Sequence, residues 1–368
     1  MPIFMDRHEV SGGISAETLA KIHQEDLKIE HEFGCRGFTY WFDEEKNSAF
    51  CLIEAPNKQA IVDMHHQAHG NVPNQIIEVD SNIVASFLGR ISDPEKAQDT
   101  ELNIINDPAF RIIMVIETSS YLNRLEANQY SIFTQKFHNS VTKTLKQYEG
   151  NIVKQNNNSY LVSFTSVSNA IFCALKIQSN YKYITPKFDL SNRRLKIGID
   201  AGVPVTNKNN FFEETISMAT RMCENVKGDI VISSEVKSLY ESENRNAFLN
   251  KEQIRSLSVD EEDFLTGLMD FMETVWTNPD VHVSNFGKAL GYSKSQLYRK
   301  MMALTGKSPN TFLREYRLHQ ALKLLHEQRG NISEIAFQTG FNSLAYFSEC
   351  FKNKFKILPS KYIQQHVF

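Results

Sequence analysis

The stretch that decides the fold of this chain is residues 331–355, NISEIAFQTGFNSLAYFSECFKNKF. Asn331 can cap a helix, and Gly340 stands where the chain must leave that helix sharply, since glycine takes positive φ without strain. Ser343 can cap a second helix, in which aromatic residues recur at helical spacing. These aromatic residues are Tyr346, Phe347, Phe351 and Phe355. The stretch therefore predicts a helix, a tight turn and a second helix that ends among lysines.

The same pattern occurs upstream, in residues 283–304, VSNFGKALGYSKSQLYRKMMAL. We expect Ser284 and Ser293 to cap two helices that meet at Gly291. Between the two units, apolar side chains form one stripe, which predicts a long core helix that holds the units at a fixed spacing. The stripe consists of Phe312, Leu313, Tyr316, Leu318, Ala321, Leu322 and Leu325. Two helix-turn-helix units held in this way can enter successive major grooves of double-stranded DNA, roughly 34 Å apart.

The charge distribution supports a DNA-binding module at this end of the chain. From residue 281 onward there are thirteen lysines and arginines but four glutamates, a net charge of +9 in a chain whose total is −3. The rest of the chain therefore carries about −12. Segregation of this kind is typical of a nucleic-acid-binding module. A solvated basic face is the alternative, but here the charge coincides with two helix-turn-helix patterns.

Residues 264–366 resemble the DNA-binding domain of AraC/XylS-type regulators. The matching segments are SKSQLYRKMMALTGKSPNTFLREYRL, ISEIAFQTGFNS, YFSECFKNKF and LPSKY. Two positions depart from the family: Lys356 replaces a usual glycine after the last phenylalanine, and Glu349 stands where arginine is frequent. The first should perturb a helix end slightly. The second bears on base choice, because a carboxylate accepts a hydrogen bond from cytosine N4 but is repelled by phosphate.

The predicted recognition helices supply the candidate DNA contacts. In the first helix we expect Ser295, Tyr298 and Arg299 to face bases, with Lys294 and Lys300 nearer to phosphates. In the second helix the candidates that face the groove are Ser343, Leu344, Ala345, Ser348 and Glu349, and Lys352 is expected at the DNA backbone. Tyr346 and Phe347 are interpreted as core residues.

Length and composition limit the remaining possibilities. A chain of 368 residues suggests two or three domains. It contains no apolar run long enough to span a membrane and starts without a secretory signal, so we expect a cytoplasmic protein without a membrane partner. Its five scattered cysteines lack CxxC spacing and predict reduced thiols instead of disulfides or a zinc cluster.

The first 80 residues combine a βαββαβ pattern with many histidines. Strands are predicted at 2–6, 37–42, 49–54 and 75–80, and helices at 15–33 and 57–69; this order is that of an α+β ferredoxin-like fold. His65 and His69 are four residues apart and share a helix face, as do His23 and Asp26, three apart. Imidazoles with a carboxylate suit nickel, zinc, copper or iron. Hydrogen-bonding or surface roles for these histidines remain the alternative.

This segment resembles the DUF4242 family of small ferredoxin-like proteins of the nickel-binding type. The matching residues are MPIFMDRH, AKIHQEDL, YWFDEEKNSAFCLIEAP and HHQAHG. The resemblance implies a divalent metal, with nickel favoured. The candidate ligands are His8, His23, His65 and His69, with Asp26 or Asp6 as additional or supporting groups. Cys51 lies within an apolar strand and is interpreted as a packing residue.

A connector is predicted over residues 81–107, followed by a second α+β domain over 108–245. Its predicted order is a strand, a long helix, a hairpin around Asn156–Asn158, a helix, strand 194–202, helix 214–226, strand 229–234 and a final helix. The all-α DNA-binding domain, with both helix-turn-helix units, is predicted over 260–368. The fold class is therefore a multidomain chain of two α+β units and one helical unit.

The middle domain resembles the class III nucleotide cyclase homology domain, through GNIVK, YLVSF, KIGIDAGVPV, ISMATRM and GDIVISSEV. Such cyclases need two metal-binding carboxylates. Glu117 stands at the first position, but neutral Asn158 stands at the second. Ser217 replaces an asparagine, whereas Arg221 matches the family. The resemblance thus implies a degenerate, catalytically inactive domain for dimerisation or ligand binding, with Glu117, Lys154 and Arg221 as candidate contacts. Surface charges without a ligand are the alternative interpretation of Lys154 and Arg221.

Together these features favour a DNA-binding transcription regulator that senses a divalent metal through its N-terminal domain. A homodimer is expected, and RNA polymerase is a candidate further partner. Two alternatives stay open at this point. An active nucleotide cyclase could be fused to the DNA-binding domain, or the N-terminal domain could act as a metal buffer without a role in signalling.

Overall fold

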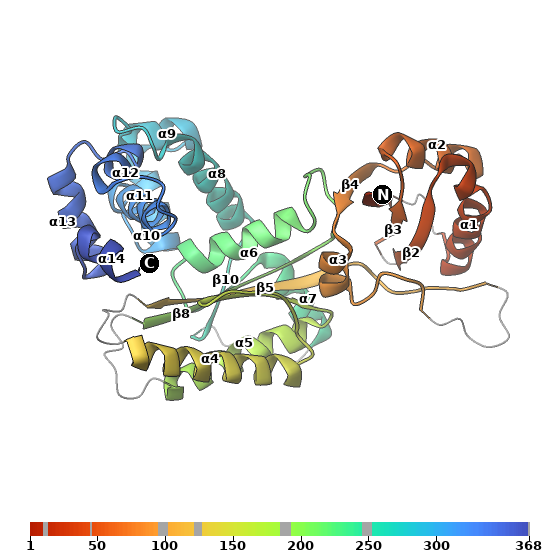
Figure 1. Cartoon of the computed structure of the whole chain (residues 1–368), viewed down its shortest axis with the longest axis horizontal. Helices are drawn as coiled ribbons and strands as arrows, with labels where there is room; N and C mark the ends of the chain where they lie inside the picture. Colours follow the sequence, from red (N-terminus) through yellow and green to blue (C-terminus); the bar gives the residue numbers. More distant parts are fainter. Residues whose placement is uncertain are drawn as a thin grey trace.

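The computed structural model describes residues 1–9, 14–44, 46–94, 102–120, 127–184, 193–244 and 252–366. The chain forms three successive units (Figure 1), an N-terminal α/β unit, a middle α/β unit and a C-terminal bundle of helices. Within the described residues, no helix is both long and apolar enough to cross a membrane.

The N-terminal unit has the predicted order of strands and helices. Its elements are β1 (Ile3–Glu9), α1 (Ala16–Ile29), a 3₁₀ turn (Glu30–Phe33), β2 (Arg36–Asp43), β3 (Ser48–Glu54), α2 (Lys58–Ala68) and β4 (Gln75–Val79). The four strands form a sheet in the order β2-β3-β1-β4, and the neighbouring strands are antiparallel. Ser15 and Asn57 cap the two helices by accepting hydrogen bonds from Thr18 and Ala60. Side chains alternate between the two faces of each strand, so this sheet has two apolar faces.

One face packs on α1 and α2, and the other packs on the middle unit. Met5, Trp41 and Leu52 of the second face form one cluster with Phe87 and with Phe212 of the middle unit. Phe87 belongs to α3 (Ser81–Leu88), a helix within the segment 81–107 that is predicted only as a connector. Its apolar residues Val84, Phe87 and Leu88 follow helical spacing, and their burial explains why this part is helical.

The middle unit is built on a six-stranded sheet in the order β10-β9-β8-β5-β7-β6. The strands are β5 (Arg111–Ser120), β6 (Asn151–Gln155), β7 (Ser159–Phe164), β8 (Arg193–Gly202), β9 (Ile230–Ile232) and β10 (Ile254–Ser256). β8, β9 and β10 run parallel, whereas β8, β5, β7 and β6 form antiparallel pairs. The predicted strands and hairpin are found, and β10 is an additional strand that is not among the predicted ones.

Helices cover both faces of this sheet. α4 (Ala127–Gln147), α5 (Val167–Ile184) and α7 (Ser234–Glu243) contribute to the main core, and α6 (Glu213–Asn225) lies on the opposite face from α4 and α5 (Figure 1). α6 approaches β8 closely: a Cβ atom on Gly198 would lie 2.0 Å from the carbonyl oxygen of Ala219. Glycine is therefore required there for α6 to pack on the sheet.

The C-terminal unit contains the two predicted helix-turn-helix units. Its helices are α8 (Val259–Val275), α9 (Val283–Leu290), α10 (Lys294–Thr305), α11 (Pro309–His326), α12 (Ile332–Gln338), α13 (Leu344–Phe355) and α14 (Pro359–His366). Gly291 and Gly340 take positive φ at the two turns, as predicted. Ser293, Asn331 and Ser343 are the N-caps of α10, α12 and α13.

The predicted cap at Ser284 is wrong. α9 begins one residue earlier, at Val283, and its N-cap is His282. The His282 backbone N–H donates to Asn285 Oδ1 over 2.8 Å, which fixes the start of the helix before Ser284.

The long helix α11 joins two separate cores. Phe312 and Leu313 belong to a core that also contains Met222, Val226 and Val231 of the middle unit. The backbone N–H of Lys227 donates to the Leu304 carbonyl over 2.9 Å at the same contact. Tyr316 packs against the same core, whereas Leu318, Ala321, Leu322 and Leu325 belong to a second core with α12, α13 and α14. The first helix-turn-helix unit is therefore packed on the middle unit.

Candidate metal centre and nucleic-acid interface

A buried cluster of histidines and aspartates lies between the helices and the sheet of the N-terminal unit. His65 of α2 occupies its centre, with Nε2 at 2.9 Å from Asp6 Oδ2 and Nδ1 at 3.0 Å from Asp26 Oδ1. Asp6 comes from β1 and Asp26 from α1, so three elements supply the three groups. All three side chains are almost fully removed from solvent.

Two further histidines extend the cluster on either side. His69 follows His65 by one helical turn, and its Nε2 lies 3.1 Å from Asp26 Oδ1 and 3.2 Å from His65 Nδ1. On the other side, His8 Nε2 lies 3.4 Å from Asp6 Oδ1. This His8 atom is buried, and no described residue gives it a hydrogen bond with good geometry.

The charges in the cluster stabilise one another. Burial opposes the ionised form of Asp6, but the neighbouring His8 and His65 outweigh it and hold the pKa of Asp6 well below its usual range. Burial also opposes ionisation of Asp26, yet hydrogen bonds from His65 and His69 lower its pKa. For His65, burial favours the neutral ring, but the two carboxylates raise its pKa to about 10.

The donor atoms of this cluster fit a divalent transition metal. Two sets of three groups each lie within 4.8 Å of one another, Asp6 with His8 and Cys51, and Asp26 with His65 and His69. Imidazole, carboxylate and thiol donors suit nickel, zinc, copper or iron better than calcium or magnesium. In the second set, His65 lies in the last turn of α2 and His69 is the C-cap residue that follows the helix, with its backbone N–H donating to the His65 carbonyl.

His23 belongs to the same cavity but to neither set of donors. The cavity has a volume of ≈ 300 Å³, and its walls include His8, His23, Asp26, His65 and His69. The His23 ring packs against Tyr40, with 4.9 Å between ring centres, and burial lowers the pKa of His23. Of the predicted ligands, His8, Asp26, His65 and His69 thus have their donor atoms in the cluster, whereas His23 lines the wall.

Asp6 and Cys51 lie closer to the centre of the cluster than their predicted supporting and packing roles imply. Asp6 and His8 are two residues apart on β1, and this spacing places both side chains on one face of a strand. The signal for Asp6 was therefore present in the MDRH segment. Cys51 pairs with Asp6 across the antiparallel β1–β3 ladder, and its position depends on a strand register that the sequence does not reveal.

The first recognition helix, α10, presents the predicted polar residues to solvent. Lys294, Ser295, Tyr298 and Arg299 are exposed, and half of the Tyr298 surface is accessible (50%). Lys300 is only half-exposed, because its ammonium lies 5.0 Å from the centre of the Tyr292 ring. The helix therefore offers a polar and basic face outward while Leu297 and Met301 are buried.

The second recognition helix, α13, has a similar outer face. Ser343, Leu344, Ala345, Glu349 and Lys352 are exposed and Ser348 is half-exposed. The interpretation of Phe347 as a core residue is confirmed, since its side chain is fully buried. The same interpretation of Tyr346 is wrong: 50% of its surface is accessible, because it lies on the outer side of the first helical turn.

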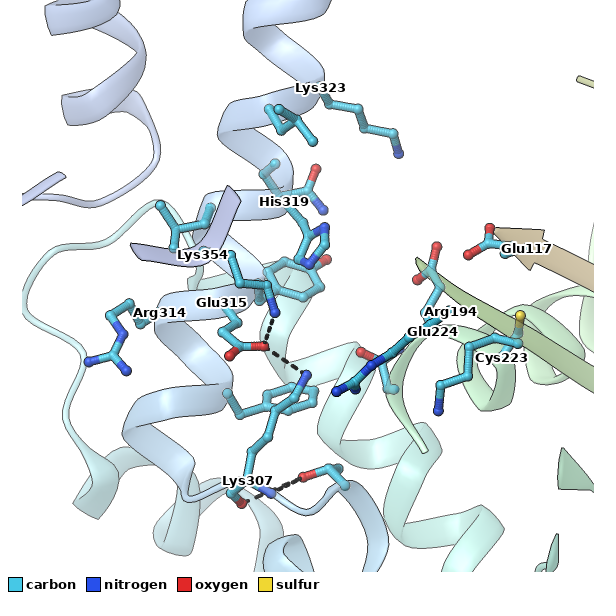
Figure 2. Close-up of a pocket in the computed structure, with 18 of the residues that line it drawn as sticks. Glu117, Arg194, Cys223, Glu224, Lys307, Arg314, Glu315, His319, Lys323 and Lys354 are labelled. Carbon is cyan, nitrogen blue, oxygen red and sulfur yellow. Dashed lines mark hydrogen bonds and ion pairs between the residues drawn. The ribbon is translucent and has the colours of Figure 1, made fainter. Parts of the chain in front are cut away.

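A third candidate region is the cleft between the middle unit and the C-terminal helices (Figure 2). It has a volume of ≈ 1720 Å³ and is lined by β5, β8 and α6 on one side and by α11 and α13 on the other. Glu117, Asn158, Ser217 and Arg221 all line it, whereas Lys154 lies outside it, exposed on the edge strand β6.

The charges of two of these residues, Arg221 and Glu117, are altered by their neighbours. Arg221 Nη2 lies 2.6 Å from Asp270 Oδ1 and 3.6 Å from Glu273 Oε1, so its charge is already compensated by α8. Burial and the nearby Glu224 raise the pKa of Glu117 to about 7, although Lys323 opposes this. At neutral pH, Glu117 is therefore only partly ionised.

Comparison with known families matches both ends of the chain. Residues 286–365 match the family described as a helix-turn-helix domain. Residues 4–79 match the family described as nickel responsive protein SCO4226-like. The crystal structure of SCO4226 from Streptomyces coelicolor A3(2) is 32% identical and covers 21% of this chain and 94% of its own, with a TM-score of 0.20.

Several curated proteins match a part of the chain. The probable transcription factor PqrA of Proteus vulgaris is 30% identical over 102 residues, which is 27% of this chain and 84% of that protein. The transcriptional activator RhaS of Mannheimia succiniciproducens is 41% identical over 63 residues, 17% of this chain and 24% of RhaS. Histidine kinase P4 of Formosa agariphila is 39% identical over 110 residues, 30% of this chain. The match spans only 8% of that kinase.

Proposed function

The chain belongs to the AraC family of helix-turn-helix regulators, and from that premise we propose that it binds specific DNA sequences and regulates their transcription. One observation carries this proposal: α11 joins two helix-turn-helix units whose second helices, α10 and α13, both expose side chains that can contact DNA, with Lys294 and Arg299 on α10 and Lys352 on α13. Such a pair suits successive major grooves on one face of DNA. A homodimer would double this footprint, and RNA polymerase is the partner that an activator would contact.

We further propose that the N-terminal unit, with its ferredoxin-like order of elements, makes this regulator responsive to nickel. Asp26, His65 and His69 would hold the ion, with Asp6 and His8 beside them. The match to a nickel-responsive family and the mixed imidazole and carboxylate donors support this choice of metal. When bound, the ion supplies a fixed double positive charge that draws α1, α2 and β1 together.

A route from the metal centre to the middle unit exists through β1. Asp6 and His8 face the cluster, and Met5 and Arg7 face the other way. Met5 packs in the cluster that contains Phe87 and Phe212, and Arg7 Nη1 donates to the Val205 carbonyl over 3.4 Å. A metal can change DNA affinity only if it binds two arrangements of the units with different affinity.

The experiment measures DNA affinity with and without nickel. The full chain is titrated into a labelled duplex from upstream of its own coding region, at constant ionic strength, and fluorescence anisotropy gives the dissociation constant. The variants are a double substitution, His65→Ala with His69→Ala, and the control His66→Ala. His66 is the matched control because it lies on the same helix but is exposed.

We expect nickel to change the dissociation constant of the wild type and of His66→Ala by at least about fivefold. The double variant should lose both the response and the bound nickel found by elemental analysis, while it keeps its metal-free DNA affinity. Equal affinity with and without nickel in the wild type would refute the metal response and leave DNA binding intact. Nickel bound without any response would instead favour a metal buffer.

For the middle unit we propose a cyclase-like fold without cyclase activity. Asn158 stands where a second metal-binding carboxylate would be needed, and the raised pKa of Glu117 reduces the remaining negative charge at neutral pH. We expect no cyclic nucleotide from ATP or GTP with manganese, for the wild type and for Asn158→Asp alike. Product formed by the wild type would favour the alternative of an active cyclase fused to a DNA-binding domain.

A further inference from the structure

We propose that the cleft between the middle sheet and the C-terminal helices binds a phosphate group, held by Arg194, Lys307 and Lys354. This site is distinct from the metal centre, and the proposal does not depend on the nickel response. The proposal gives a ligand class to the cleft that lies between the middle unit and the second helix-turn-helix unit.

The three cations come from both sides of the cleft. Arg194 lies on β8 of the middle unit, Lys307 lies between α10 and α11, and Lys354 lies on α13. Figure 2 shows the Arg194 side chain extending from the sheet toward Lys307 and Glu315. The pairing of a guanidinium with two ammonium groups across a gap resembles the donor set that phosphate oxygens need.

Around Arg194, Lys307 and Lys354, the cleft contains more positive than negative charge. Glu315 Oε2 accepts from Lys354 Nζ at 2.6 Å and lies 2.9 Å from Lys307 Nζ, so one carboxylate serves two ammonium groups. In the part of the chain that the structure describes, no carboxylate lies within 4.0 Å of the Arg194 guanidinium. The site therefore has uncompensated positive charge.

This excess of positive charge also lowers the pKa values of the nearby lysines. Burial lowers the pKa of Lys354, Glu315 opposes this, and the charges of Lys307 and Arg194 lower it further. Burial likewise lowers the pKa of Lys196, two residues from Arg194 on the same face of β8; Asp229 opposes this, whereas Arg194 and Lys307 add to it. A dianion between these groups would relieve their repulsion and gain charge-assisted hydrogen bonds.

Acidic side chains that also line the cleft limit the shape of the ligand. Glu117 and Glu224 belong to this lining, and burial raises the pKa of both. A polyanion that ran along the whole cleft would meet these two acids. A small molecule with a single phosphate, and with hydrogen-bond donors that face these acids, fits the lining. A single phosphate of bound DNA is the other source of the same chemistry.

The test uses inorganic phosphate as the probe and the full chain as the protein. The ³¹P line width of phosphate is followed during titration with protein at constant ionic strength. The variants are Arg194→Gln, Arg194→Lys and the control Arg329→Gln. Arg329 is the matched control because it is an exposed arginine of the C-terminal unit that does not line the cleft.

We expect the wild type and Arg329→Gln to broaden the line equally. Arg194→Gln should bind phosphate roughly tenfold more weakly or not at all, because it loses a charged forked donor. Arg194→Lys keeps the positive charge but lacks the two-pronged guanidinium donor, so its phosphate affinity should lie between those of the wild type and Arg194→Gln. This graded loss distinguishes weaker binding from a failure to fold. Equal broadening by the wild type and Arg194→Gln, or none by the wild type, would overturn the proposal.

A second arm distinguishes the two sources of phosphate. DNA affinity of the wild type and Arg194→Gln is measured over a series of salt concentrations. Unchanged DNA affinity in Arg194→Gln assigns the site to a small phosphorylated ligand. A lower affinity, with a salt dependence reduced by about one charge, assigns it to a DNA phosphate.

Discussion

At the scale of single residues, Glu315 holds the second helix-turn-helix unit to the turn that precedes α11. Burial disfavours its charge, but Lys307 and Lys354 outweigh burial and lower its pKa to about 2 from an ordinary value of 4.5. Its pKa in the folded state is below that in the unfolded state. The stabilisation is therefore complete above the ordinary value and is lost as the pH falls toward about 2.

This predicts a pH-dependent difference between the wild type and Glu315→Gln. Between about pH 6 and about pH 3, the wild type should lose roughly 1–3 kcal/mol of unfolding free energy that the variant does not lose. Urea denaturation at both pH values measures the effect. Glu349→Gln, an exposed glutamate of the same unit, should behave like the wild type; if all three proteins lost the same amount, Glu315 would not be the cause.

The residues of the candidate metal centre show how far a sequence can predict a site. His65 and His69 were predictable because helix periodicity places them on one face. The central position of His65 was not predictable, since its two carboxylate partners lie 39 and 59 residues away in sequence. Cys51 joined the candidates only once the register of β1 and β3 was known.

At the scale of elements, the end of α13 is strained. Lys356 is its C-cap and has φ of 62°, a left-handed conformation that costs a residue with a Cβ atom about 1 kcal/mol. The resemblance to AraC-type domains led us to expect only a slight perturbation there. The structure agrees, because the Lys356 backbone N–H still donates to the Lys352 carbonyl over 2.8 Å.

Replacing Lys356 by glycine should therefore stabilise the chain. Lys356→Gly removes the Cβ clash and should raise the unfolding free energy by about 0.5–1 kcal/mol. Lys352→Gly, in the exposed interior of the same helix, should lower it by about 1 kcal/mol. Urea denaturation monitors both. Destabilisation of similar size by both glycines would show that the conformation at Lys356 carries no strain.

Most elements were predictable because local signals specify them. Three N-caps and two glycine turns of the C-terminal unit were predicted correctly, because a cap depends only on residues within one helical turn. β10 was missed because it has three residues and its place depends on parallel pairing with β9. α3 was missed because its polar neighbours concealed a short apolar stripe.

At the scale of the whole molecule, α3 connects the N-terminal unit to the middle sheet. Phe87 stacks on Phe212, with 4.9 Å between ring centres, and also contacts Phe211. The same cluster contains Met5 and Trp41 of the N-terminal sheet. The near-continuous apolar run of β3 was a signal for burial on both faces, but it could not identify the partner surface.

Phe87→Ala should uncouple the two units. The cavity left by the smaller side chain should lower the free energy of unfolding by about 3–5 kcal/mol. The N-terminal unit should then unfold in a thermal transition of its own. Nickel should still bind, but its effect on DNA affinity should disappear. Phe172→Ala, an exposed phenylalanine on α5, is the control and should preserve both. Calorimetry and the anisotropy titration measure these effects, and an intact nickel response in Phe87→Ala would exclude this route.

The two-sided character of β1 limits how this protein can change during evolution. Substitutions can alter either face of the strand independently. Insertion or deletion of one residue, however, would exchange the two faces, so that Asp6 would point toward the apolar contact and Met5 toward the histidines. Descendants of this chain can therefore vary the composition of β1, but its length is fixed as long as both surfaces are in use.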